Sequence, residues 1–452
     1  MDKFDDMILK TLSNMRKIVV YRNILKDPVI TRFQEILNLS AIGESGNLAL
    51  KYHDFIGMLV ERAEFEGTIL SGDLWKDFII DLILADENPF SLGCEVSGIN
   101  GIGQALKELA VQDLQSLHDL FNFDFKFLIE LLNQKFPGTG FREFPVHYEA
   151  CGVKSQPCPI ALWEKKKNLF KILADSKDWA LNLNELALFY KEAGCGKFGR
   201  YWGFKLEVTE GSPRLSGVPE PDPVRLSDLV GYESQKKEVV ENTRQFVMGY
   251  SANNMLLYGD RGTGKSSTIK ALLHEFGKDG LRMVEVPKYH LAHLSWVIAV
   301  LKKRPQRFII FIDDLSFEEN ETEYKYLKSI LEGSLEATPE NVLIYATSNR
   351  RHLVREFHSD TEGDEIKARD TVQEKLSLSD RFGITVVFPS PDKTEYLEIV
   401  EGIARQRGIE LDAEKLKELA MKWELWNNQR SGRTAKQFID DLAGKMGTGA
   451  FQ

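Results

Sequence analysis

NMLLYGDRGTGKSSTIKALLHEFG, residues 254–277, decides the fold of the chain around it. A short apolar run is followed by GDRGTGKS, which matches the pattern G-x-x-x-x-G-K-[ST] in full. The segment after it repeats apolar residues at the period of a helix, at Ile269, Leu272, Leu273 and Phe276. The stretch therefore predicts a strand, a glycine-rich loop and a helix, which is the arrangement that this phosphate-binding motif requires.

The residue types of the loop explain how it holds phosphate. Glycines let the backbone turn closely, so that successive N–H groups converge on phosphate oxygens. A helix that begins near Lys265 adds its positive end, and the Lys265 ammonium places a charge on the terminal phosphates. The hydroxyl of Ser266 is a ligand for Mg²⁺. We therefore predict a nucleotide-phosphate site made by the whole loop: Gly259, Asp260, Arg261, Gly262, Thr263, Gly264, Lys265, Ser266 and Ser267.

A second apolar run, FIIFIDDLSFEEN at residues 308–320, ends in two adjacent carboxylates. We expect Asp313 to hold Mg²⁺ through water and Asp314 to polarise the attacking water. Asp314 is one methylene shorter than the Glu usual at such a position, and a misplacement of about 1 Å costs about a hundredfold in rate. A shifted water, slow hydrolysis, or a substitute carboxylate at Glu318 or Glu319 are the alternatives, as is a role for Asp314 as a helix cap.

Three further polar residues follow in the order that nucleotide hydrolysis needs. Asn349 comes directly after the strand-like run VLIYATS and can hydrogen-bond the attacking water or the terminal phosphate. Arg381 precedes the last such run, ITVVF, and can reach a neighbouring subunit's nucleotide, a contribution of about 10³–10⁵ in rate. Arg433 begins a helical segment and can bridge it to the terminal phosphate. Taken singly, each arginine is as expected for a surface charge. The order and spacing of these residues together favour a role in the nucleotide site.

The 452 residues exceed what one core organises, and the sequence pattern changes along the chain. Residues 1–205 repeat apolar residues at helical intervals, which predicts a mostly helical N-terminal domain. Residues 206–223 are rich in Pro and Gly and predict a stiff linker. Residues 224–390 alternate short apolar runs with helical ones, which predicts a parallel sheet with crossover helices. Residues 391–452 predict a small helical lid.

Composition narrows the class of protein. Hydrophobic residues at 43% and charged residues at 28% are ordinary for a soluble globular protein. A net charge of −10 argues against non-specific coating of nucleic acid. No apolar stretch reaches the roughly 18–20 residues of a membrane span, and the N-terminus MDKFDDMILKTL does not resemble a secretory signal. We therefore expect a cytoplasmic protein with no membrane partner.

Two weaker patterns point to sites that we do not expect. GCGKFG, residues 194–199, matches the dinucleotide fingerprint G-x-G-x-x-G, but it follows a helical segment instead of a strand. We predict instead that Gly194 ends that helix as a left-handed cap. A metal site near His147 is disfavoured because the four cysteines lack the close pairing of zinc ligands, which favours buried or incidental thiols at Cys94, Cys151, Cys158 and Cys195.

Together these motifs resemble the AAA+ ATPases over residues 224–445, about the second half of the chain. The resemblance implies an α/β P-loop module, with a parallel sheet, flanking helices and a small helical lid, that binds ATP and Mg²⁺. The segment LSDLVGYESQKKEV looks like the stretch that covers the base, which implies that Leu229, Val230 and Gly231 line it. By the same similarity the site has a sensor-1 residue, an arginine finger and a sensor-2 residue at Asn349, Arg381 and Arg433.

A narrower resemblance concerns DDLSFE, LEGSLEATPENVLIYATSNRRHLV and EKLSLSDRFG. These segments are similar to an uncharacterised bacterial AAA+ family with a helical N-terminal region, whose members also carry the aspartate pair. The resemblance implies a ring-like homo-oligomer but no substrate. ATP and GTP are not distinguished by these residues.

The sequence leaves three tasks open for the hydrolysis. The first is the remodelling of a protein partner captured by residues 1–205, without continuous threading, because residues 286–308 lack the aromatic–hydrophobic–glycine tripeptide of threading loops. The second is a DNA-associated loader or switch, suggested by the basic runs LKKRPQR and SNRRHLVR, although such runs are usually solvated and Arg350 and Arg351 also suit a subunit interface. The third is a nucleotide-gated scaffold that hydrolyses slowly, consistent with the short Asp314.

Overall fold

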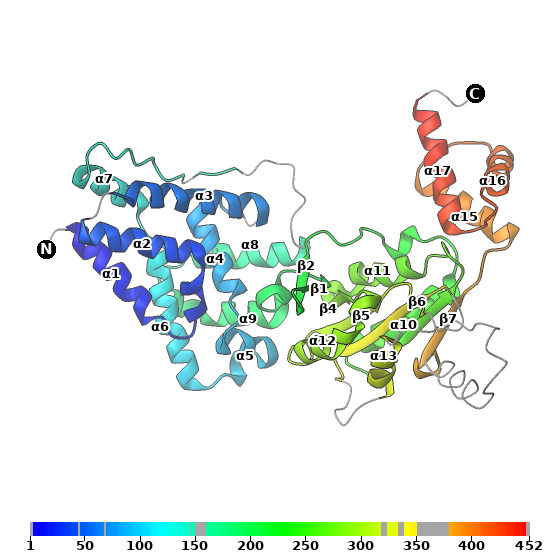
Figure 1. The fold of residues 1–452 in the computed structure, drawn as a ribbon, viewed down its shortest axis with the longest axis horizontal. Helices are drawn as coiled ribbons and strands as arrows, with labels where there is room; N and C mark the ends of the chain where they lie inside the picture. Colours follow the sequence, from blue (N-terminus) through cyan, green and yellow to red (C-terminus); the bar gives the residue numbers. More distant parts are fainter. Residues whose placement is uncertain are drawn as a thin grey trace. The chain divides into compact units, whose positions relative to one another are not determined.

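A computed structural model describes residues 3–43, 46–66, 69–145, 147–149, 160–317, 323–332, 339–349 and 379–448. The chain divides into two compact units, Met1–Tyr201 and Trp202–Gln452, which are described in turn (Figure 1). Among the described residues, no helix combines the length and apolar character that crossing a membrane requires.

The first unit is helical, as its periodicity predicted (Figure 1). Its α-helices are α1 Lys3–Lys17, α2 Pro28–Ile42, α3 Leu48–Glu66, α4 Leu74–Ala85, α5 Pro89–Ser97, α6 Gln104–Phe121, α7 Phe125–Lys135, α8 Ile160–Asp175 and α9 Leu183–Ala193. Single 3₁₀ turns connect some of them: η1 Arg22–Lys26, η2 Ile99–Gly101, η3 Trp179–Asn182 and η4 Gly196–Gly199.

Aromatic side chains from several helices form the centre of this unit. Phe33 of α2 and Phe55 of α3 are fully buried, and Trp75 of α4 is 1% exposed. The ring centroids of Phe33 and Trp75 lie 4.8 Å apart, and those of Trp75 and Phe125 lie 5.2 Å apart. Large rings brought together in this way exclude much water per residue, so they stabilise the helical packing.

Buried carboxylates also tie distant segments of the first unit together. Asp113 of α6 accepts hydrogen bonds from the backbone N–H groups of Val20 and Tyr21, at 2.6 and 2.9 Å, which fixes the turn after α1. Asp81 of α4 is paired with Lys166 of α8. Burial of Asp81 is the largest single effect and opposes its ionisation, yet Lys166 and Arg200 together outweigh burial and hold the pKa of Asp81 below its usual range.

The second unit contains a seven-stranded sheet in the order β2-β1-β4-β5-β6-β3-β7. Its strands are β1 Gly203–Thr209, β2 Ser212–Val218, β3 Met255–Gly259, β4 Leu281–Glu285, β5 Arg307–Ile312, β6 Val342–Ser348 and β7 Ile384–Phe388. All neighbouring strands are parallel except β1 and β2. The flanking helices and turns are η5 Leu226–Asp228, α10 Glu233–Val247, α11 Lys265–Phe276, η6 Gly277–Asp279, η7 Lys288–His293, α12 Leu294–Leu301, α13 Glu323–Glu332 and η8 Ser379–Arg381.

The structure corrects the predicted linker at residues 206–223. Most of this segment belongs to the hairpin of β1 and β2, which pairs with the sheet beside β4. The turn is made by Glu210 and Gly211, both with positive φ, of 52° and 78°. Pro213 is tolerated because β2 is the edge strand, where one face of the backbone needs no ladder hydrogen bond. Leu206 and Leu215 are buried, so the hairpin contributes to the core.

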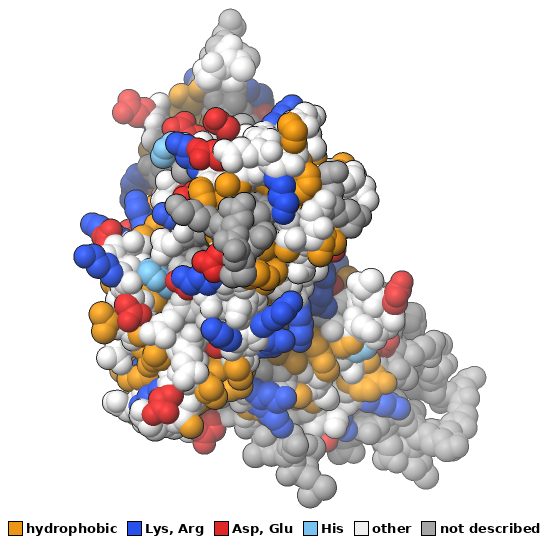
Figure 2. Space-filling view, turned by 90° about the vertical axis from the view of Figure 1, so that its left-hand side faces the viewer, with side chains coloured by type: hydrophobic (Ala, Val, Ile, Leu, Met, Phe, Trp, Pro, Cys, Tyr) orange, Lys and Arg blue, Asp and Glu red, His pale blue; other side chains and the backbone are white. Residues whose placement is uncertain are grey.

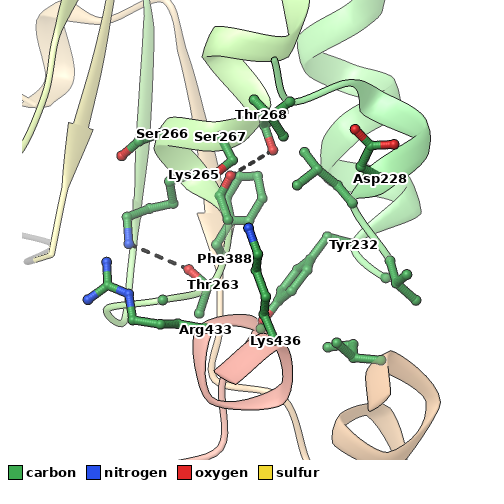
Figure 3. A pocket seen from close by; sticks show the side chains of 18 of the residues that line it. Asp228, Tyr232, Thr263, Lys265, Ser266, Ser267, Thr268, Phe388, Arg433 and Lys436 are labelled. Carbon is green, nitrogen blue, oxygen red and sulfur yellow. Dashed lines mark hydrogen bonds between the residues drawn. The ribbon is translucent and has the colours of Figure 1, made fainter. Parts of the chain in front are cut away.

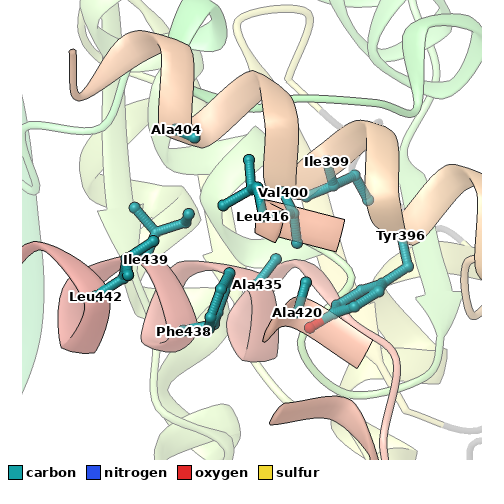
Figure 4. Close-up of a cluster of buried hydrophobic side chains, with 10 residues drawn as sticks. All are labelled: Tyr396, Ile399, Val400, Ala404, Leu416, Ala420, Ala435, Phe438, Ile439 and Leu442. Atoms are coloured by element: carbon teal, nitrogen blue, oxygen red, sulfur yellow. The ribbon is translucent and has the colours of Figure 1, made fainter. Parts of the chain in front are cut away.

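The lid consists of α15 Lys393–Gln406, α16 Ala413–Asn427 and α17 Gly432–Gly447. It has an apolar cluster of its own, shown in Figure 4, made by Tyr396, Ile399, Val400, Ala404, Leu416, Ala420, Ala435, Phe438, Ile439 and Leu442. A mostly parallel sheet, a loop between β3 and α11 and a small helical lid are the features implied by the AAA+ resemblance. The predicted fold class is therefore confirmed.

Candidate active site

A pocket of about 1100 Å³ lies where the loop after β3, the segment before α10 and the lid meet (Figure 3). Residues 222–224 and 228–232 line one side, and residues 261–268 line the floor. Asp313, Asp314, Thr347 and Asn349 line the edge at the ends of β5 and β6, while α15 and α17 close the pocket from the lid. The pocket is thus large enough for a nucleotide and lies at the carboxyl ends of parallel strands, where ligands of such sheets bind.

Two glycines of the loop are required by close contacts as well as by conformation. Gly259 has φ of 148°, and a Cβ there would lie 1.9 Å from the carbonyl oxygen of Phe388. Gly262 has φ of 79°, and a Cβ would lie 2.8 Å from Oγ of Ser431, at the start of the last lid helix. The loop is therefore packed against β7 on one side and against the lid on the other.

Lys265 is 5% exposed, and its ammonium is held by the loop itself. Its Nζ donates to the carbonyl oxygens of Gly259 and Asp260, at 2.8 and 2.7 Å, and to Oδ1 of Asn349 at 3.3 Å. Burial lowers the pKa of Lys265, while nearby carboxylates, Asp260 first among them, oppose that shift. A phosphate oxygen bound at this position would replace weak carbonyl acceptors by a charged one, which favours binding.

Asp313 lies beside the loop serine, as a magnesium site requires. Its Oδ1 accepts hydrogen bonds from the hydroxyls of Ser266 and Thr347, both at 2.6 Å. Because Ser266 donates its proton to Asp313, its lone pairs remain available to a cation. A hydroxyl and a carboxylate are the hard oxygen ligands that Mg²⁺ prefers, so these residues fit that ion.

Asp314 and Asn349 are already paired. Asn349 Nδ2 donates to Asp314 Oδ1 at 2.5 Å, and Asp314 has φ of 49°, in the left-handed region. No helix begins within Leu315–Phe317, so the described residues give no cap role to Asp314. The possible substitutes Glu318 and Glu319 lie outside the described residues.

The lid contacts the loop through the start of α17. The backbone N–H of Arg433 donates to the carbonyl oxygen of Gly262 at 3.1 Å. Figure 3 shows the Arg433 side chain directed toward Lys265, and shows Lys436 entering the same pocket from the next turn. Our sequence analysis did not identify Lys436. Its position three residues after Arg433, on the same helical face, is the signal that would have found it.

The other end of the pocket is more apolar. Leu229, Val230 and Gly231 line it, as the resemblance implied, together with Ile399 and Ile403 of α15. An apolar end of this kind suits the flat base of a nucleotide.

Two aromatic residues of this end were not singled out from the sequence. Tyr232 and Phe388 both line the pocket, and their ring centroids lie 5.3 Å apart. Tyr232 has φ of 58°, and its hydroxyl donates to the carbonyl oxygen of Pro389 at 2.7 Å. Phe388 could have been found from its position as the last residue of the strand-like run ITVVF.

Arg381 does not line the pocket of its own chain. It lies in η8, its side chain is 46% exposed, and Nη2 is 3.0 Å from Oε1 of Glu332. A role in this chain's own site is therefore not supported by the geometry, and a role in a neighbouring chain's site stays a prediction.

The two weaker sequence patterns have structural explanations among the described residues. Gly194 ends α9 with a positive φ of 91°, but its ψ of 173° is not that of the predicted left-handed cap. Cys94 and Cys195 are buried, the thiol of Cys195 donates to Oε2 of Glu95 at 3.6 Å, and Cys151 and Cys158 lie outside the described residues. In the described part of the chain, no three His, Cys, Asp or Glu side chains gather as a metal site would need.

Comparison with known proteins identifies a protein family that matches this chain. A family model described as "Protein of unknown function (DUF815)" matches residues 200–446. No curated protein matches the chain. Similar solved structures include the Thermotoga maritima RuvB Holliday junction branch migration motor, with 16% identity over 49% of this chain and 72% of that chain and a TM-score of 0.30. Another is AMPPCP-bound DnaA from Aquifex aeolicus, with 18% identity over 50% of this chain and 67% of that chain and a TM-score of 0.36.

Proposed function

We propose that this chain, which belongs to the family described as protein of unknown function DUF815, is a Mg²⁺-dependent ATPase. The family description assigns no activity, so the proposal is made from the residues of the chain's own site. Membership of this family confirms the prediction that the chain belongs to a family whose function is uncharacterised. The observation that supports the proposal is the meeting of a phosphate loop, an acidic strand end and a lid arginine in one pocket. We further propose that the protein works as a homo-oligomer that remodels or switches a macromolecular partner.

In the bound state, the loop N–H groups and Lys265 hold the phosphates, and the lid arginine Arg433 reaches the terminal one. Ser266 and Asp313 would hold Mg²⁺, which would supply positive charge against the phosphate oxygens. Lys265 exchanges its loop carbonyl partners for phosphate oxygens. The lid therefore closes on a triphosphate through the same helix that already contacts the loop.

In hydrolysis, Asp314 and Asn349 orient the attacking water. The water oxygen bonds to the terminal phosphorus, the bond from that phosphorus to the bridging oxygen breaks, and ADP and phosphate leave. Asp314 accepts a hydrogen bond from the water, for which Asn349 must share or release its present bond to Oδ1. Proton acceptance by a positioned carboxylate is ordinary general-base chemistry.

Calorimetric titration of the full chain with Mg-ATP, together with a phosphate-release assay, tests the proposal. Lys265→Ala is expected to weaken ATP affinity at least about tenfold, since it removes a charge-assisted contact. Lys278→Ala is the matched control, because Lys278 follows the same helix, is exposed and does not line the pocket. Absence of binding by the wild-type chain, or equal binding by the Lys265 variant, would refute the proposed activity.

We propose that the helical unit binds the partner. Large apolar side chains are exposed on it, among them Phe65 at 73% and Ile42 at 72%. Figure 2 shows apolar groups interspersed with Lys and Arg on one face. Exposed apolar groups with charged neighbours are typical of protein-binding surfaces, which supports a protein partner over a purely electrostatic one.

A nucleotide-gated scaffold with slow turnover is the second candidate. The hydrogen bond from Asn349 to Asp314 occupies a carboxylate oxygen that the attacking water needs, which supports slow hydrolysis. The DNA-associated alternative has weaker support. In the basic run at residues 301–307, Arg304 is only 8% exposed and Arg307 lies over the ring of Phe246. Binding with negligible turnover favours the scaffold, whereas turnover stimulated by DNA and lost at raised salt favours the loader.

A further inference from the structure

Thr347 is a buried residue that no sequence motif marks. It lies near the end of β6 and is 1% exposed. In the parallel pair of β5 and β6, Ile312 is opposite Ala346, so the next residues of the two strands, Asp313 and Thr347, lie side by side. The register of the sheet thus brings a hydroxyl to the acidic strand end.

Thr347 holds three consecutive residues at that end. Its hydroxyl donates to Oδ1 of Asp313 at 2.6 Å and accepts the backbone N–H of Asp314 at 3.0 Å. Its carbonyl oxygen accepts the backbone N–H of Leu315 at 2.7 Å. The hydroxyl therefore serves as donor and acceptor at once, which an apolar side chain of the same shape cannot do.

The residue between these contacts has an unusual backbone. Asp314 has φ of 49°, and residues other than glycine persist there only where their surroundings fix them. Thr347 contributes to that fixation by accepting the N–H groups of Asp314 and Leu315, and the Asp314 N–H is shared with Oδ1 of Asp313 at 3.1 Å. In this conformation the Asp314 carboxylate reaches the Asn349 amide at 2.5 Å.

We infer that Thr347 is a positioning residue for the hydrolysis proposed above, on which this inference rests. Its hydroxyl orients the Asp313 carboxylate and fixes the left-handed backbone of Asp314. The backbone conformation of Asp314 then sets the position of its carboxylate, which compensates for a side chain one methylene shorter than that of Glu. Thr347 acts through its hydrogen bonds to the two aspartates.

Kinetics of the full-length chain with Thr347→Val and Thr347→Ser test this role. Valine keeps the shape and removes the hydroxyl, so we expect kcat to fall at least about tenfold with KM for ATP within about twofold. The Mg²⁺ concentration for half-maximal turnover is expected to rise, because Asp313 loses a donor that orients it. Serine keeps the hydroxyl and is expected to retain kcat within about threefold.

A matched control separates positioning from general stability. Thr243 of α10 is also fully buried, and its hydroxyl donates to the carbonyl oxygen of Val239 at 2.8 Å and contacts the Tyr345 hydroxyl at 3.0 Å, away from the pocket. Thr243→Val is expected to lower the melting temperature and leave kcat unchanged. Thr347→Ala replaces the valine variant if valine prevents folding.

The outcomes distinguish this inference from the proposed function. Equal kcat in the wild type and Thr347→Val, or equal losses with serine and valine, would overturn the role of Thr347 alone. A wild-type chain that binds no Mg-ATP would overturn the proposed function and this inference with it. If the wild type binds ATP without turnover, the gain in ATP affinity from Mg²⁺ is the readout, and an undiminished gain in Thr347→Val overturns the inference.

Discussion

At the scale of single residues, the acidic strand end is fitted to an aspartate. The Asp314 carboxylate meets the Asn349 amide at 2.5 Å, and its backbone at φ 49° is held by a neighbouring strand. A longer side chain on the same backbone would displace Asn349 or lose its hydrogen bond. The sequence raised the question whether reach limits hydrolysis, and the geometry favours a site built around Asp.

Asp314→Glu is therefore expected to lower kcat by about tenfold or more, because a carboxylate shifted by about 1 Å loses alignment with the water. Steady-state hydrolysis, with ATP affinity measured separately by calorimetry, checks this. Asp314→Asn keeps the length and removes the charge, so it shows the loss expected when the acid itself is absent. A higher kcat in the Glu variant would mean that reach limits the wild type.

At the same scale, the sequence suggests those candidate site residues whose motifs are local. Asp313 directly follows the apolar run of β5, and Lys265 begins the helix after the loop that follows β3, so chain order alone places both near the carboxyl ends of strands. Thr347 and Lys436 were missed for different reasons. The inferred role of Thr347 depends on the register of β5 against β6, which no local pattern encodes. Lys436 was visible only as the next residue on the helical face of Arg433.

At the scale of elements, the predicted helices formed where apolar residues repeat at helical intervals, and the predicted strands formed at short apolar runs such as FIIFI and ITVVF. The hairpin of β1 and β2 was mistaken for a linker because Pro and Gly suit both an edge hairpin and an extended connector. Leu206 and Leu215, buried on the hairpin, were the apolar signal against a linker. Where turn residues such as Pro and Gly interrupt a segment, residue propensities are a poor guide to whether that segment forms a strand.

The contact between the phosphate loop and α17 gives a prediction at this scale. Gly262→Ala would bring a Cβ to 2.8 Å from Oγ of Ser431 and 3.0 Å from Cβ of Arg433. The loop and the lid helix must then move apart. Because both hold the nucleotide, we expect ATP affinity to fall at least about tenfold. Calorimetric titration with Mg-ATP measures the loss.

Gly280→Ala is the control for backbone strain alone. Gly280 has φ of 97°, with no atom within 4 Å of a Cβ there, and it does not line the pocket. It is expected to cost about 1–2 kcal/mol of folding free energy, seen as a lower melting temperature, with ATP affinity unchanged. Equal ATP affinity in the Gly262 variant and the wild type would show that the loop and the lid need not touch for binding.

At the scale of the whole molecule, the described residues that line the pocket run from Asp222 to Lys436 and belong to the second unit. The first unit has an aromatic core of its own. Nucleotide chemistry and partner binding are thus separable in the proposed function. Arg381 lies outside the pocket of its own chain, and in the proposed homo-oligomer it would reach the nucleotide of a neighbouring chain.

Mixed assemblies of two inactive variants test that contribution. Arg381→Ala and Lys265→Ala chains are each expected to have less than about a tenth of wild-type turnover, because a finger contributes about 10³–10⁵ in rate. In an equal mixture, a functional site needs an intact loop from one chain and an intact arginine from its neighbour. Random neighbours in a closed ring meet this condition at about a quarter of sites, so about a quarter of wild-type turnover is expected.

The ion pair of Arg381 with Glu332 provides the control, because it gives the arginine a possible structural role within its own chain. Glu332→Ala removes that pair and leaves the guanidinium free, so turnover is expected to remain near wild type if the arginine acts on a neighbour. Light scattering must show that the mixed chains assemble. Assembled mixtures without recovered turnover, or a Glu332 variant as inactive as Arg381→Ala, would assign Arg381 to the fold of its own chain.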